Sequence, residues 1–79
     1  MIRLTEIKRD NGKISCNAFV EDCKIAVPLL LDEKTGELSS YHLPSDYEWC
    51  ISHITHASKY LRSLNGKPIE SDTHTIMWY

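Results

Sequence analysis

Three residues of one predicted helix carry side chains that could bind a metal ion: Cys50, His53 and His56, in the pattern C-x-x-H-x-x-H. Residues three apart on a helix are neighbours, so any adjacent pair can reach the same ion. The full set turns through about 120° around the helix, which prevents convergence on one ion. A zinc site would also need a ligand from outside the helix: His42, Cys23 or His74. We therefore expect no metal and no other cofactor, and we keep a small metal-binding domain as a less favoured alternative.

The same residues are also the nearest approach to a nucleophilic site. Cys50 lies near the start of the predicted helix and beside His53, where a thiolate is favoured. However, no acidic or amide residue is placed to orient the histidine, and a cysteine on an apolar helix face usually serves packing. The chain also lacks the known phosphate-loop, dinucleotide, zinc-protease and nucleophile-elbow motifs. We therefore expect a protein that is not an enzyme.

A second feature of this helix is a row of four ring-bearing residues, Trp49, His53, His56 and Tyr60, which we call the aromatic stripe. Their spacing of four, three and four places them along one side of a helix. In one interpretation they widen the boundary of the core, with the histidines as neutral spacers. In the other they form a contact surface, because tryptophan and tyrosine are typical anchors of protein interfaces. The sequence leaves both interpretations open.

The helix that carries these residues is predicted to run from Ser45 to Leu64. Pro44 ends the preceding segment, and Ser45 with Glu48 forms the capping-box pattern of a helix start. Asn65-Gly66 is typical of a helix end. One arc is predicted to face the core: Tyr47, Cys50, Ile51, Ile54, Ala57, Ser58, Leu61 and Leu64. The opposite arc is predicted to face solvent: Glu48, Ser52, Thr55, Lys59, Arg62 and Ser63.

The residues before the helix predict an antiparallel meander. Residues 2–8 and 14–20 have strand patterns, and Asn11-Gly12 between them is a strong signal for a tight hairpin. The apolar alternation of the first strand changes face, which predicts a bulge near Thr5-Glu6. A third strand over residues 25–31 contains Pro28, which favours an edge position. A turn at Gly36 then leads to a short returning strand over residues 38–43.

The residues after the helix predict one more strand, over 73–79. This segment is apolar on both faces, with His74, Ile76 and Trp78 alternating against Thr75, Met77 and Tyr79. We therefore expect it to lie in the centre of the sheet or against a partner. The whole chain is predicted to form a single small α+β domain, residues 1–79. An antiparallel β-meander of four to five strands is covered on one face by one amphipathic helix, in the order ββββαβ.

Composition limits the environment of the protein. The chain has 79 residues, a net charge of −2 and three cysteines without a C-x-x-C pair. These features favour a cytoplasmic protein with free thiols, and the apolar runs are too short to span a membrane. The near balance of charge disfavours a nucleic-acid binder, although Lys59, Arg62 and Lys67 could form a basic patch, extended by Arg3, Arg9 and Lys13.

The function predicted from these observations is a small intracellular protein–protein interaction or regulatory module that associates with itself as a homodimer. A domain of this size buries too little surface to be very stable alone, and association is a common remedy. The predicted interaction surface consists of Trp49, His53, His56, Tyr60, Met77 and Tyr79. The alternative from another class is a nucleic-acid-associated accessory protein.

Overall fold

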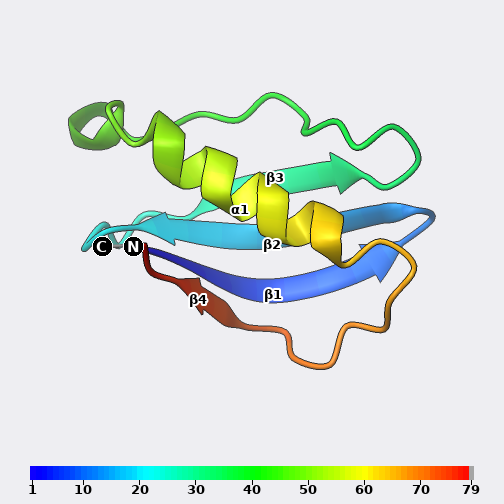
Figure 1. Ribbon diagram of the computed structural model, residues 1–79. Coiled ribbons are helices and arrows are strands. Elements are labelled where there is room, and N and C mark those ends of the chain that lie inside the picture. The colour runs from blue at the N-terminus through cyan, green and yellow to red at the C-terminus, as the bar shows by residue number, and fades with distance from the viewer. Residues whose placement is uncertain (79) are drawn as a thin grey trace.

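The computed structural model describes residues 1–78, which form one antiparallel sheet with a single α-helix lying across one face (Figure 1). The strands are β1 (Ile2–Asp10), β2 (Lys13–Val20), β3 (Val27–Asp32) and β4 (His74–Ile76), in the order β3-β2-β1-β4. The helices are the short 3₁₀ helix η1 (Ser45–Tyr47) and the α-helix α1 (Ile51–Ser63). The predicted α+β class is confirmed.

The β1–β2 hairpin follows from its turn residues. Asn11 and Gly12 both have positive φ, 52° and 74°, as the tightest hairpin turns require. Asp10 and Lys13 pair directly across the turn, so the predicted hairpin is confirmed.

The predicted bulge in β1 is also confirmed. The register between β1 and β2 shifts between Thr5 and Lys8, and Glu6 within this interval has a φ of 53°. The shift places Ile7 in the core with Ile2 and Leu4, although simple alternation would have turned it outward.

On the outer side of β3, pairing stops before it reaches Pro28. Leu31 forms a single bridge with Leu38, and the Ser39 amide donates to the Leu30 carbonyl at 2.8 Å. In the same register the next pair would join Pro28 to Tyr41 and would require an amide that proline lacks. The returning strand predicted over residues 38–43 is therefore reduced to this bridge. The edge position predicted for the proline-containing strand is confirmed.

The β3 strand also begins later than predicted. It starts at Val27, and Ile25 lies in the preceding connection with 63% of its surface exposed. The start predicted for this strand, at residue 25, is therefore wrong by two residues. The hydrogen bond from the Cys23 amide to the Val20 carbonyl shows that the chain is still turning just before this point.

The core lies between the sheet and α1. Its fully buried side chains come from both layers: Ile2, Leu4, Ile14, Leu31, Leu61, Val20, Val27 and Cys50. The other face of the sheet has no helix over it (Figure 1). On that face the Arg3 guanidinium lies 5.0 Å from the centroid of the Phe19 ring, a cation–π arrangement.

The start of the helix differs from the prediction. Residues 45–47 form η1, α1 begins only at Ile51, and neither helix start has a side-chain cap. The predicted capping box of Ser45 and Glu48 is therefore wrong. The Tyr47 hydroxyl donates to Asp22 Oδ1 at 2.8 Å, and the Cys50 amide donates to the Tyr47 carbonyl at 2.9 Å. These bonds hold the segment in tight turns that a regular α-helix would remove. The predicted helix end is confirmed, since α1 stops at Ser63 and Gly66 has a φ of 76°.

The rotation of α1 also differs from the prediction at two positions. Ile51 was placed on the core arc, but 60% of its surface is exposed. His53 was placed on the flanking stripe, but only 5% of its surface is exposed. The remaining core-facing residues Ile54, Ala57 and Leu61 are buried as predicted.

The last strand is shorter than predicted, and it lies at an edge rather than in the centre of the sheet. β4 spans His74–Ile76 and pairs with β1 alone. Its predicted alternation is confirmed through Trp78, because His74, Ile76 and Trp78 are half-buried while Thr75 and Met77 are exposed. Tyr79, which was included in the predicted interaction surface, lies outside the described residues. Within residues 1–78, no helix has the length and apolar character needed to cross a membrane.

Candidate interaction surface

Three members of the aromatic stripe pack against the C-terminal segment of their own chain. The Tyr60 ring stacks on His74 with centroids 3.8 Å apart, and His56 stacks on Trp78 at 4.2 Å. The edge of His53 meets Trp78 at 4.7 Å. Much of the stripe therefore joins α1 to β4, in the manner of the core-boundary interpretation.

His53 is the most enclosed member of the stripe. Its Nε2 lies 3.0 Å from Glu21 Oε2, and the same carboxylate oxygen accepts from the amino group of Met1. Its Nδ1 is buried and has no hydrogen-bond partner among residues 1–78. His53 therefore connects the helix to the end of β2 and, being buried, offers little surface to another molecule.

Trp49 is the one member of the stripe whose ring remains largely open. It has 64% of its surface exposed, and its edge contacts His53 at a centroid distance of 5.5 Å. Its indole N–H donates to the Asp46 carbonyl at 3.1 Å. Because this donor is already satisfied, the ring can enter an apolar partner surface without leaving an unpaired polar group.

The large exposed apolar side chains of the described residues gather at one end of the molecule, which we call the apolar end: Ile25, Tyr41, Trp49, Ile51 and Met77. The strand register explains the position of Ile25 and Met77 at this end, since Ile2 pairs with both Val20 and Ile76. The β2–β3 connection and the chain after β4 therefore meet there. Figure 1 shows both chain ends, η1 and the start of α1 at this same end.

The opposite end of the molecule is polar and internally bonded. Arg9 donates to both carboxylate oxygens of Glu33, at 2.7 and 3.0 Å, and to the carbonyls of Leu64 and Lys67 at 2.8 Å. The Arg62 Nε donates to the Gly36 carbonyl at 2.8 Å. Two arginines that the sequence offered for phosphate binding therefore hold loops together at the end of α1.

The residues of the helix considered for metal binding are each buried or engaged by another side chain. Cys50 is fully buried, His53 is bonded to Glu21, and His56 stacks on Trp78. Within residues 1–78, no group of three or more histidine, cysteine or acidic side chains is arranged to hold a metal ion.

The thiols are also poorly suited to nucleophilic attack. Burial, followed by the Glu21 charge, raises the pKa of the Cys50 thiol. Burial alone raises the pKa of Cys16 to about 11. Both thiols are therefore protonated at neutral pH, and the thiol is a much weaker nucleophile than the thiolate.

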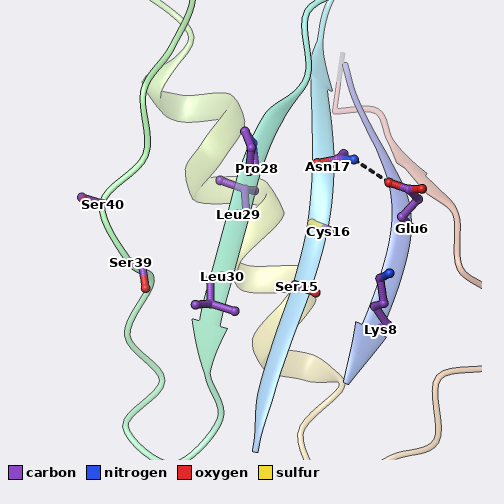
Figure 2. A pocket seen from close by; sticks show the side chains of 10 residues that line it. All are labelled: Glu6, Lys8, Ser15, Cys16, Asn17, Pro28, Leu29, Leu30, Ser39 and Ser40. Atoms are coloured by element: carbon purple, nitrogen blue, oxygen red, sulfur yellow. Dashed lines mark hydrogen bonds between the residues drawn. The ribbon is translucent and has the colours of Figure 1, made fainter. Parts of the chain in front are cut away.

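A groove of about 400 Å³ lies on the uncovered face of the sheet (Figure 2). It opens beside β3, where the chain at Ser39 and Ser40 diverges after Pro28 ends the pairing. Its lining is mixed: Glu6, Lys8, Ser15, Cys16, Asn17, Pro28, Leu29, Leu30, Ser39 and Ser40. Asn17 is bonded to Glu6 at 2.6 Å across the strands, so its amide is already engaged. This groove is not among the features predicted from the sequence, although the proline in an edge strand was a signal for it.

The comparisons with known proteins give no relationship to set beside this geometry. No protein-family model, curated protein or solved structure matches the chain.

Proposed function

We propose that this protein is a small protein–protein interaction module that associates with itself through the apolar end. The observation that carries the proposal is the position of Trp49, whose ring is exposed while its N–H is satisfied within its own chain. Tryptophan in this state is typical of the residues that supply most of the binding free energy in interfaces.

The distribution of the other apolar side chains supports the same proposal. Single exposed hydrophobic residues are ordinary on protein surfaces and need no explanation. Here the large ones among residues 1–78 lie together at the end that holds Trp49 and Met77, whereas the other end carries the bonded charges of Arg9 and Glu33. This asymmetry is typical of a molecule with one contact surface.

The size of the domain favours a second copy as the partner. A chain of 79 residues buries only about 60% of the surface that it exposes when unfolded. Small domains commonly gain the missing stabilisation by association. Association with a second copy of the same chain would stabilise the domain without requiring a different protein.

The test is sedimentation velocity of the purified protein from about 1 µM to about 1 mM, a range that brackets ordinary weak dimers. We expect a monomer–dimer equilibrium, and we expect Trp49→Ala to raise the dissociation constant at least about tenfold, as loss of an anchor residue does. Lys34→Ala, an exposed site at the polar end, is the matched control and should leave the constant unchanged.

Two outcomes would overturn the proposal. One is a monomer across the whole range. The other is a dimer in which Trp49→Ala and Lys34→Ala have equal effects, because the apolar end would then play no part in association. Circular dichroism of each variant establishes that the fold is retained.

A further inference from the structure

We infer that the two copies pair through the outer edge of β4, antiparallel and around Thr75, so that their sheets join into one. This inference rests on the proposed self-association and names the strand that performs it. The β4 strand is at the edge of the sheet and pairs only with β1.

The strand register shows which backbone groups face outward. The Glu21 amide donates to the Met1 carbonyl, so residues 1 and 3 direct their backbone groups toward β2. Ile2 and Leu4 therefore direct theirs toward β4, where they pair with Ile76 and His74. Thr75, which lies between these two, turns its N–H and C=O away from β1 by alternation. The N–H and C=O of Thr73, just before the strand, are occupied by the Ser71 hydroxyl at 3.3 and 3.1 Å.

The two edges of the sheet differ in their protection. On the β3 edge, Pro28 removes a donor and Leu38 covers part of the strand. Lysine, proline, bulges and covering segments are the usual means by which proteins block an exposed edge. Residues 73–78 contain no proline and no aspartate, glutamate, lysine or arginine, so the β4 edge lacks both of these side-chain blocks, and the Ser71 hydroxyl covers only the backbone of Thr73.

A second copy fits this edge because the edge is complementary to itself. Around a two-fold axis at Thr75, the two Thr75 residues exchange both of their backbone hydrogen bonds, whereas the N–H and C=O of Thr73 are already bonded to the Ser71 hydroxyl and add no further pair. The Thr75 side chains then form a cross-strand threonine pair, and no like charges oppose each other. Thr75 is preferred to residue 74 as the position of the axis, because a shift to residue 74 would bring the bend at Asp72 closer to the paired region.

The exposed side chains near β4 supply area that the backbone pairing lacks. A stable interface buries roughly 800 Å² on each partner, more than the short strand β4 provides by itself. Met77 follows β4 directly and has 67% of its surface exposed. Trp49 contacts His53, which contacts Trp78, so the exposed indole stands on the β4 side of the helix. Both residues adjoin the edge that we assign to the second copy.

The decisive variant is Thr75→Pro, which removes the outward N–H and leaves the amides of His74 and Ile76 for the β1 ladder. Thr75→Val keeps the N–H and serves as the matched control. By sedimentation velocity we expect wild type and Thr75→Val to dimerise alike, and Thr75→Pro to have a dissociation constant at least about tenfold higher.

Amide hydrogen exchange by NMR provides a second measurement on the wild-type chain, which decides the matter even if Thr75→Pro fails to fold. We expect exchange at the Thr75 amide to slow at least about tenfold between dilute and concentrated samples, while exposed amides of the β1–β2 turn stay unchanged.

The outcomes separate the two proposals. A wild-type monomer at all concentrations overturns both. A dimer that is weakened by Trp49→Ala but not by Thr75→Pro, or whose Thr75 amide exchanges equally fast at both concentrations, overturns the pairing through β4 and leaves the proposed function standing.

Discussion

The Nε2 atom of His53 lies 3.0 Å from Glu21 Oε2 and joins the first turn of α1 to the end of β2. Glu21 directly follows the strand and has a φ of 50°, a left-handed conformation that is uncommon outside glycine. The histidine also lies between two indoles, with Trp49 at 5.5 Å and Trp78 at 4.7 Å. One buried side chain thus connects the sheet, the helix and the C-terminal segment.

We expect His53→Ala to destabilise the protein by about 2–4 kcal/mol, because it removes a buried ring and leaves Glu21 without this donor. His56→Ala, which loses one stacking contact at a half-buried position, should cost less than about 1.5 kcal/mol and is the control. Urea denaturation followed by circular dichroism measures both values. Equal losses would show that the Glu21 contact contributes nothing.

The rotation of α1 gives a second prediction. Leu61 is fully buried against the sheet, so Leu61→Ala should cost about 2–5 kcal/mol. Ile51→Ala, at an exposed position of the same helix, should change the free energy of unfolding by less than about 0.5 kcal/mol. The same denaturation experiment measures both, and a loss at Ile51 as large as that at Leu61 would contradict the helix orientation described here.

The third prediction concerns alkaline pH. The hydrogen bond to Asp22 is the main cause that raises the pKa of Tyr47 from 10.0 to about 12. The folded state therefore holds this proton more tightly than the unfolded state, and the resulting stabilisation is complete below pH 10 and is lost between pH 10 and about pH 12. Ultraviolet titration of tyrosinate should show the late titration of Tyr47. Tyr47→Phe should remove it, and its persistence in that variant would contradict the assignment.

A fourth prediction follows from the end of pairing at Pro28. Pro28→Val restores an amide on the outer side of β3, so we expect the pairing that now ends near Ser39 to extend to Tyr41. Slowed amide exchange at residue 28 and cross-strand NMR contacts between residues 28 and 41 would show the extension. An unchanged spectrum for residues 40–43 would mean that something other than the missing donor separates these segments.

The features that depended on neighbouring residues could be predicted from the sequence. Asn11-Gly12 specifies a tight turn because both residues adopt positive φ. Pro28 favours an edge strand because proline lacks an amide proton to donate, whatever the rest of the fold is. The β1 bulge was visible because Ile7 breaks the alternation set by Ile2 and Leu4. Each of these signals is local.

The start and rotation of the helix could not be predicted in this way. A capping box at Ser45 is a sound local signal, but the bond between Tyr47 and Asp22 joins segments far apart in the chain and outweighs it. His53 faces inward and Ile51 faces solvent because Glu21 and Trp78 contact the His53 side of the helix. These partners are known only once the strand order is known.

The candidate surface was also predicted only in part, because its local pattern is visible in the sequence but its tertiary contacts are not. The aromatic stripe was visible as a pattern, but the sequence could not tell which of its rings would be covered by β4. Tyr60 is covered by His74 of β4 and His56 by Trp78, which follows the strand, and Trp49 is left open. Ile25 and Tyr41 were not among the predicted interaction residues, since they join Trp49 and Met77 only through the topology of the sheet.

The pairing of Ile2 and Leu4 with Ile76 and His74 brings together the two extremes of the sequence. The entropy lost on closing a loop grows with the length of the loop. Pairing of β1 with β4 closes most of the chain into a loop, whereas the β1–β2 hairpin closes over a few residues. The hairpin is therefore expected to form early, and docking of β4 to complete the folding reaction. Until that step the nascent sheet exposes the flank of β1, so the speed of β4 docking sets how long the chain is vulnerable to misassembly.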